Sequence, residues 1–146
     1  MRNHKAGLLA LALAAATGPA FSVTPQQEGT YSGSMSLKVY DITGKIGSRK
    51  LLMLMQLGTD HVKNEDVTTV TLNGIPQVSG QGSSIYGASE GIVLFNDLDG
   101  KAVYLASVHM KGTSIKGSVT GFRSIDTQST ALTETYEGKL TLKKLP

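Results

Sequence analysis

The stretch Gly91-Ile-Val-Leu-Phe-Asn-Asp-Leu-Asp-Gly-Lys-Ala-Val-Tyr-Leu-Ala-Ser-Val-His-Met-Lys-Gly112 decides the fold class, because it predicts two β-strands joined by a tight turn. Residues 92–95 are apolar, β-branched or aromatic, as in strands, and Asp99-Gly100 supplies a turn that tolerates positive φ. The residues that follow alternate between two faces, with Ala102, Tyr104, Ala106, Val108 and Met110 opposite Val103, Leu105, Ser107, His109 and Lys111. This period of two predicts a strand with one face in the core.

The first and last predicted strands, residues 30–41 and 133–145, share a sequence pattern. Tyr31-x-Gly33-x-Met35-x-Leu37-Lys38 in the first matches Tyr136-x-Gly138-x-Leu140-x-Leu142-Lys143 in the last. Glycine inside a strand normally weakens it, so its recurrence indicates a bend or a close approach of two backbones. We expect the two strands to pair and thereby to remove the free edges of the sheet. Coincidence between two alternating strands is the alternative explanation.

Further segments complete the expected sheet. Residues 67–73 and 113–124 have the composition and patterning of strands, and residues 77–86 contain one irregular strand, with Pro76 indicating a sheet edge. The connecting segments are 42–48, which predicts a turn, and 59–66 and 125–132, which predict loops. The run Leu51–Leu57 is apolar on both faces and is rich in good helix formers, and Gly58 could cap a helix. We interpret it as a buried strand because the segments around it are β, and we interpret Met53 and Met55 as core filler.

The strand count and spacing predict the fold class. About 7–8 strands without a helical stretch suit an all-β domain, a single small antiparallel β-barrel or sandwich with meander-like connectivity, over residues 30–146. Residues 23–29 have no periodicity and are expected to form a flexible N-terminal arm.

Residues 1–22 have the pattern of a signal peptide. Arg2 and Lys5 precede a short apolar run, residues 8–16, and small residues allow cleavage after Ala16, Ala20 or Ser22. The run is too short for a transmembrane helix, which needs about 20 residues. We therefore expect a periplasmic or secreted protein that does not span a membrane after cleavage.

Composition narrows the classes of function. The chain has no cysteine, which excludes thiolate chemistry and disulfides and favours a bacterial exported protein. Its 14 basic and 11 acidic residues become 12 and 11 once Arg2 and Lys5 leave with the signal peptide, a net charge of +1. A balance this close to neutral gives no argument for nucleic acid as a partner.

No catalytic or metal site is predicted. His61 lies near Asp60, Glu65 and Asp66, but the spacing matches no metal motif, and a solvated loop explains it better. His109 falls on the predicted solvent face of its strand. The segment Asn96-Asp97-Leu98-Asp99-Gly100 resembles a calcium loop only faintly and is explained by turn chemistry. We therefore assign no catalytic residue, no metal and no cofactor.

Three hypotheses of function remain. The first is a non-enzymatic binding protein that holds a small apolar or amphipathic ligand in a β-barrel, since a barrel of about eight strands can enclose one. The candidate lining residues are Tyr31, Met35, Tyr104, Met110 and Tyr136, if their faces point inward. The second is a cell-envelope or secreted interaction domain with a packed core and a protein partner. The third, a hydrolase-like enzyme using His61 or His109, is the least favoured.

Overall fold

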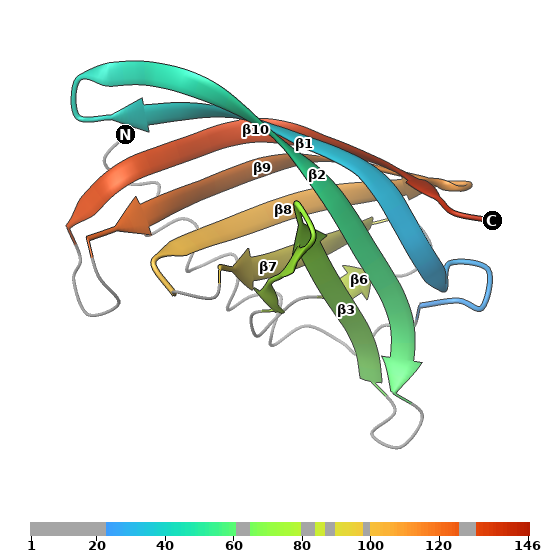
Figure 1. Cartoon of the computed structure of the whole chain (residues 1–146). Coiled ribbons are helices and arrows are strands. Elements are labelled where there is room, and N and C mark those ends of the chain that lie inside the picture. The colour runs from blue at the N-terminus through green and yellow to red at the C-terminus, as the bar shows by residue number, and fades with distance from the viewer. Residues whose placement is uncertain (1–22, 61–64, 80–83, 87–89, 98–99, 126–130) are drawn as a thin grey trace.

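The alternating segments of the chain form one antiparallel β-sheet that curls into a half-barrel (Figure 1). The computed structural model describes residues 23–60, 65–79, 84–86, 90–97, 100–125 and 131–146. Within them the strands are β1 (Gly29–Asp41), β2 (Gly44–Asp60), β3 (Glu65–Leu72), β4 (Ile75–Pro76), β5 (Val78–Ser79), β6 (Ser84–Tyr86), β7 (Glu90–Asn96), β8 (Ala102–Lys111), β9 (Ser114–Ser124) and β10 (Leu132–Lys144). The all-β class is confirmed, and a single curled sheet replaces the choice between barrel and sandwich.

The strand order shows how the two chain ends meet in the middle of the sheet. The order is β4-β3-β2-β1-β10-β9-β8-β7-β5, and β6 also pairs with β7. Neighbours in this order are mostly consecutive in sequence, but β1 pairs with β10 (Figure 1). The expected pairing of first and last strands is therefore confirmed. This pairing joins two meanders at the centre of the sheet, however, so the two ends of the sheet are formed by β4 and β5 instead.

Two glycines explain how β1 and β10 come so close. Gly33 lies opposite Leu142 in the ladder between these strands, and Gly138 lies opposite Leu37. A Cβ atom at Gly33 would overlap the carbonyl oxygen of Thr141, and one at Gly138 would overlap the carbonyl oxygen of Ser36. The repeated glycine of the sequence pattern therefore marks a close approach of two backbones, which a side chain would prevent.

A short segment connects the two ends of the sheet. β4 pairs with β3 at one end, and β5 pairs with β7 at the other. Between them, the backbone nitrogen of Gln77 donates a hydrogen bond of 2.8 Å to the carbonyl oxygen of Val70. Pro76 lies in β4, the outermost strand at its end of the sheet, where its missing N–H costs no ladder bond.

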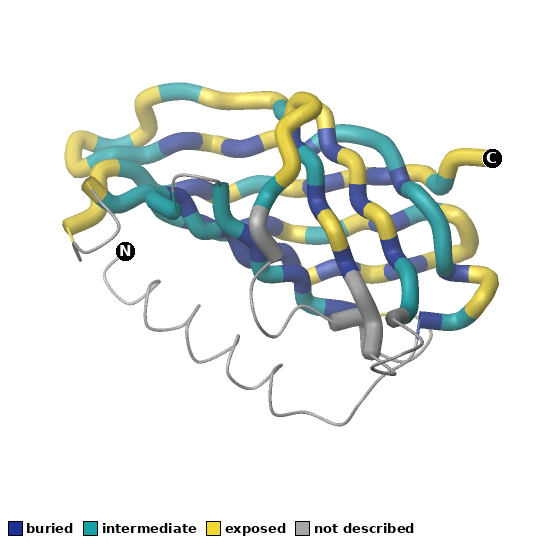
Figure 2. The backbone as a smooth tube through the Cα atoms, turned by 60° about the horizontal axis from the view of Figure 1, so that its bottom comes forward, coloured by how far each residue is buried: buried dark blue, intermediate teal, exposed yellow. Residues whose placement is uncertain are grey.

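The core lies on the inner, concave face of the half-barrel. Buried and exposed positions alternate along each long strand (Figure 2). The largest fully buried side chains are Tyr31, Tyr136, Phe95, Met35, Met53, Met55, Ile115, Leu140, Leu142, Val70 and Val93. The inward face expected for β8 is confirmed, although Leu105 on the opposite face is buried as well. Residues 25–27 form a turn before β1, and Val23 and Gln27 are buried.

The interpretation of Leu51–Leu57 as a strand is confirmed, and Met53 and Met55 are buried in the core as expected. The strand is buried on one face only, however, because Leu52 and Leu54 are 69% and 40% exposed. Two further expectations around β2 were wrong. The turn expected at 42–48 is only Ile42–Thr43, because β1 and β2 form one long hairpin. The strands also continue into the loop expected at 59–66, whose residues 61–64 lie outside the described part.

Candidate functional site

The five residues predicted to line a ligand site all lie on the inner face. Tyr31 and Met35 come from β1, Tyr104 and Met110 from β8, and Tyr136 from β10, and each side chain is at most 5% exposed. They do not form one site. The hydroxyl of Tyr31 donates a 2.8 Å hydrogen bond to the carbonyl oxygen of Gln27, near the start of β1. Tyr104 and Tyr136 belong to a different, aromatic group.

Phe95, Tyr104 and Tyr136 form a stacked aromatic row across the inner face. The ring centroids of Phe95 and Tyr104 are 5.1 Å apart, and those of Tyr104 and Tyr136 are 5.5 Å apart. Gly121 of β9 lies between Tyr104 and Tyr136 in the ladder. A Cβ atom there would come within 3.0 Å of one ring and 3.3 Å of the other, so the glycine allows the rings to meet across β9. Offset stacking of this kind adds to the burial of the rings.

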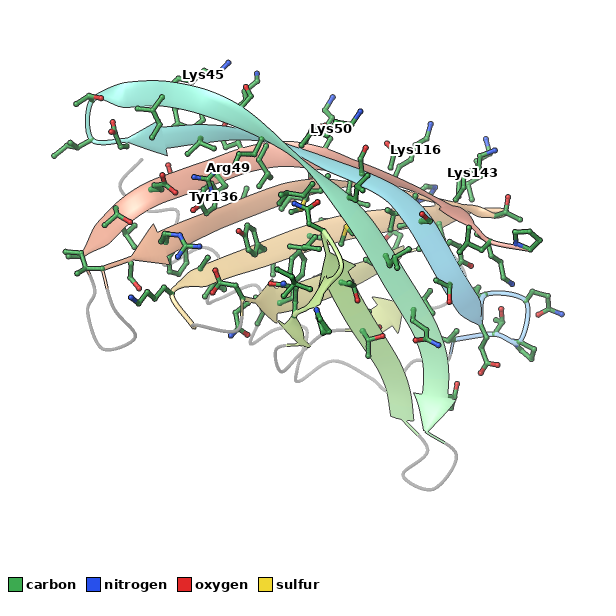
Figure 3. The ribbon with its side chains drawn as sticks, in the orientation of Figure 1. Lys45, Arg49, Lys50, Lys116, Tyr136 and Lys143 are labelled. Atoms are coloured by element: carbon green, nitrogen blue, oxygen red, sulfur yellow. The ribbon has the colours of Figure 1, made fainter. Side chains whose placement is uncertain are left out.

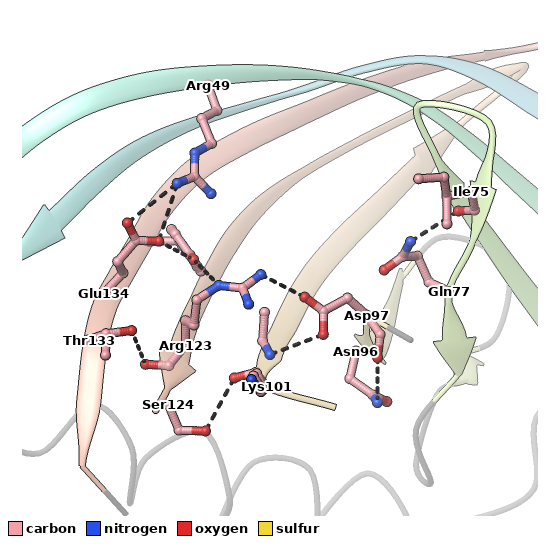
Figure 4. Close-up of polar contacts among 12 residues, drawn as sticks. Arg49, Ile75, Gln77, Asn96, Asp97, Lys101, Arg123, Ser124, Thr133 and Glu134 are labelled. Atoms are coloured by element: carbon pink, nitrogen blue, oxygen red, sulfur yellow. Dashed lines mark hydrogen bonds and ion pairs between the residues drawn. The ribbon is translucent and has the colours of Figure 1, made fainter. Parts of the chain in front are cut away.

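A polar cluster of Arg49, Asp97, Arg123 and Glu134 lies beside the aromatic row, and Figure 4 shows the contacts within the cluster. The hydroxyl of Tyr136 donates a 2.6 Å hydrogen bond to Glu134 and accepts one of 3.3 Å from Nε of Arg123. The guanidinium of Arg123 also donates to the carboxylate of Asp97 at 2.7 Å. The buried ring of Tyr136 therefore carries its polar end into a network of charged groups.

Arg49 covers the ring of Tyr136. Its guanidinium carbon lies 5.7 Å from the ring centroid, and one of its nitrogens lies 3.3 Å from an oxygen of Glu134. Figure 3 shows Arg49 on the inner side of β2, whereas the adjacent Lys50 points outward. The side chain of Arg49 is 45% exposed and that of Glu134 is 19% exposed. An ion pair this accessible contributes only about 0–1 kcal/mol, so it can open at little cost.

The environment of the two phenols raises their pKa above the ordinary value of about 10. Burial, together with the nearby Tyr136 and Asp97, raises the pKa of Tyr104 to about 12. Burial and the hydrogen bond to Glu134 raise the pKa of Tyr136. Neither phenol is therefore prepared to act as a base or nucleophile near pH 7. The arrangement therefore places the partly exposed guanidinium groups of Arg49 and Arg123 beside buried aromatic rings.

Sequence reasoning missed Phe95, Arg49, Arg123 and Glu134. Arg123 continues the inward phase of Ile115, Val119 and Gly121, and Glu134 has the phase of Tyr136, so alternation alone could have placed both on the inner face. Arg49 was harder to place, because the segment before it was assigned to a turn.

The other residues considered from the sequence do not join this site. His109 is exposed on the outer face, as expected, and His61 and Asp99 lie outside the described residues. Asp97 accepts hydrogen bonds from Arg123 and from the backbone nitrogen of Ala102. Among the residues that the structure describes, no three His, Asp or Glu side chains are grouped to hold a metal ion. The same part of the chain contains no helix that could cross a membrane.

Comparison of the chain with protein-family models, with curated proteins and with solved structures finds no match.

Proposed function

We propose that this chain is an exported, non-enzymatic binding protein that takes a small amphipathic ligand at the end of the aromatic row. The observation that carries the proposal is the position of Arg49, whose accessible guanidinium covers the otherwise buried ring of Tyr136. Movement of this one side chain would uncover an apolar surface without breaking the sheet. The freed guanidinium could then bind an anionic head group through two parallel hydrogen bonds.

The cost of opening supports this site over the deeper core. Tyr31, Met35 and Met110 are enclosed by the sheet, so a ligand among them would have to displace well-packed side chains. At the polar cluster a ligand replaces one weak ion pair and a cation–π contact, which is worth about 0.5–1 kcal/mol when exposed. The polar cluster is therefore the place where binding costs least.

The test uses an amphipathic anion with an aromatic body, 1-anilinonaphthalene-8-sulfonate, and follows its fluorescence as the folded protein is added. We expect Arg49→Met to weaken binding by about tenfold, equivalent to about 1.4 kcal/mol. Lys45→Met, on the exposed tip of the same strand, should leave it unchanged. Equal affinity of the two variants, or no binding by the wild-type protein, would contradict the proposal. Unfolding in urea shows whether both variants remain folded.

The expectation of export has its own test. A positively charged start followed by an apolar run and small residues supports it. Expression of the full chain in a bacterium should yield protein in the periplasm or medium whose intact mass corresponds to cleavage after Ala16, Ala20 or Ser22. Recovery of uncleaved chain in the cytoplasm would argue against export.

A second candidate function is an interaction domain with a packed core. It is favoured by exposed apolar side chains on the β1–β2 hairpin, where Ile42 is fully exposed and Ile46, Leu52 and Leu54 are 40% exposed or more. Light scattering over a range of protein concentrations distinguishes the candidates. A dimer that is lost in Leu52→Lys, together with no binding of the anionic probe, would favour the interaction domain.

A further inference from the structure

The outer face of the sheet carries a groove on the side opposite the polar cluster. Its volume is about 710 Å³, and it runs over the central strands β2, β1 and β10. The exposed side chains along it are Ser36, Lys38, Ser48, Lys50, Glu137 and Lys139. Leu37, Arg49 and Gly138 also border the groove, but they lie opposite one another in the inward phase of the three strands, and Leu37 is buried on the inner face. The volume falls within the range of sites for small molecules, about 300–1,000 Å³.

The strand register arranges the lysines of this groove in a defined pattern. Lys50, Ser36 and Lys139 lie opposite one another in a single row across β2, β1 and β10. Adjacent strands are about 4.8 Å apart, so the backbones of Lys50 and Lys139 are separated by about 10 Å, with a serine between them. Lys38 lies two residues along β1 from Ser36 and on the same face.

Basic side chains outnumber acidic ones in the groove. Three lysines face one carboxylate, that of Glu137. Of the two ion pairs between described residues, Arg49 with Glu134 and Arg123 with Asp97, neither involves a lysine. Lys38, Lys50 and Lys139 therefore have no carboxylate within 4 Å in the described part of the chain. Figure 3 shows Lys116 and Lys143 on the same outer side of the sheet, and neither of them lines the groove.

We propose that this groove is a binding site for an anion that carries two linked phosphate groups. Lysine is a compact point charge suited to phosphate, and the hydroxyls of Ser36 and Ser48 can donate to phosphate oxygens. Two lysines about 10 Å apart at the backbone can engage a phosphate each from opposite sides. Binding also removes the mutual repulsion of the three lysines. The occupant is a small diphosphate or a lipid head group of the same chemistry.

The test titrates pyrophosphate into the folded protein by calorimetry at low ionic strength. The double variant Lys50→Glu/Lys139→Glu should bind at least about tenfold more weakly than the wild-type protein. The matched control is Lys111→Glu/Lys143→Glu, because these lysines flank Ser114 in an equivalent Lys–Ser–Lys row across β8, β9 and β10, away from the groove. The control should change the affinity less than about twofold.

A second arm identifies the source of the phosphates. Sedimentation with vesicles that contain a diphosphorylated lipid is compared with sedimentation with phosphatidylcholine vesicles alone. Binding in either arm that is lost in the groove variant and kept in the control supports the site, and the arm that responds names the source. Equal losses in the two double variants would show an unspecific charge effect and overturn the proposal, as would the absence of binding in both arms. Thermal unfolding checks that each variant is folded.

Discussion

The guanidinium of Arg123 on β9 lies 2.7 Å from the carboxylate of Asp97, which follows β7 directly. The other oxygen of Asp97 accepts a hydrogen bond of 3.1 Å from the backbone nitrogen of Ala102, where β8 begins. One carboxylate therefore closes the turn between β7 and β8 and ties it to β9. The side chain of Arg123 also donates a hydrogen bond to Tyr136 of β10. Together these contacts link the four strands β7 to β10 of one meander at the polar cluster.

We expect Asp97→Ala to lower the free energy of unfolding by about 1–3 kcal/mol, because it leaves the partly buried Arg123 without its carboxylate. Urea unfolding measures the change. Glu137→Ala is the control, since this carboxylate is exposed and forms no ion pair within the described part of the chain, and its effect should stay within about 0.5 kcal/mol. Similar effects of the two substitutions would mean that the contact with Arg123 does not stabilise the fold.

The two central glycines predict a steep cost for the smallest side chain. Gly33→Ala or Gly138→Ala places a methyl group against the backbone of the partner strand, which cannot move aside without opening the β1–β10 ladder. Each substitution should cost about 1–3 kcal/mol or more, or abolish folding. Gly47→Ala on β2 is the control, because no atom lies within 4 Å of its Cβ position. It should be neutral or slightly stabilising. Wild-type stability of the Gly138 variant would contradict the close approach.

These glycines also show what could be predicted from the sequence. The repeated pattern in the first and last strands correctly indicated their pairing and the close approach of their backbones. It could not indicate where this pair lies in the sheet, because strand order depends on how the two meanders curl around a common core. The inner face was predictable because one face of each strand must be buried, which makes apolar and polar residues alternate along the sequence.

The candidate site and the groove were harder to predict. Alternation predicts apolar residues on the inner face and gives no reason to expect charged side chains there. Arg123 and Glu134 were therefore missed. The net charge of the chain did not indicate the groove. Acidic residues at turns and on the inner face offset Lys38, Lys50 and Lys139 in the total, but they do not neutralise these lysines locally. Only the strand register shows which charges share a face.

The turn between β1 and β2 gives a prediction for acidic pH. Hydrogen bonds of 2.5 Å and 2.7 Å from the hydroxyl and the backbone nitrogen of Thr43 lower the pKa of the Asp41 carboxyl. The stabilisation from the ionised form is present above the ordinary pKa and is lost as pH falls through the lowered one. Titration by NMR should show a higher pKa for Asp41 in Thr43→Val than in the wild-type protein. Thr43→Ser keeps the hydroxyl and should keep the low pKa. An unchanged pKa in the valine variant would show that the hydroxyl is unimportant.

The aromatic row predicts a loss of stability at alkaline pH. Burial raises the pKa of Tyr104 to about 12, so this phenol stays protonated in the folded chain at a pH where it ionises in the unfolded chain. The contribution of this protonated phenol to the free energy of unfolding is complete below the ordinary pKa of about 10 and is lost as pH rises to about 12.

Phenylalanine cannot ionise, so the free energy of unfolding of Tyr104→Phe should fall less over this interval than that of the wild-type protein. The two falls should differ by about 2–3 kcal/mol. Urea unfolding between about pH 9 and about pH 12 measures the difference. Tyr40→Phe, at a partly exposed position outside the core, should keep the wild-type profile. If Tyr104→Phe and the wild-type protein lost stability in parallel, the Tyr104 hydroxyl would have to be accessible to water, and the stacked row would be more open than its 5.1 Å and 5.5 Å ring separations indicate.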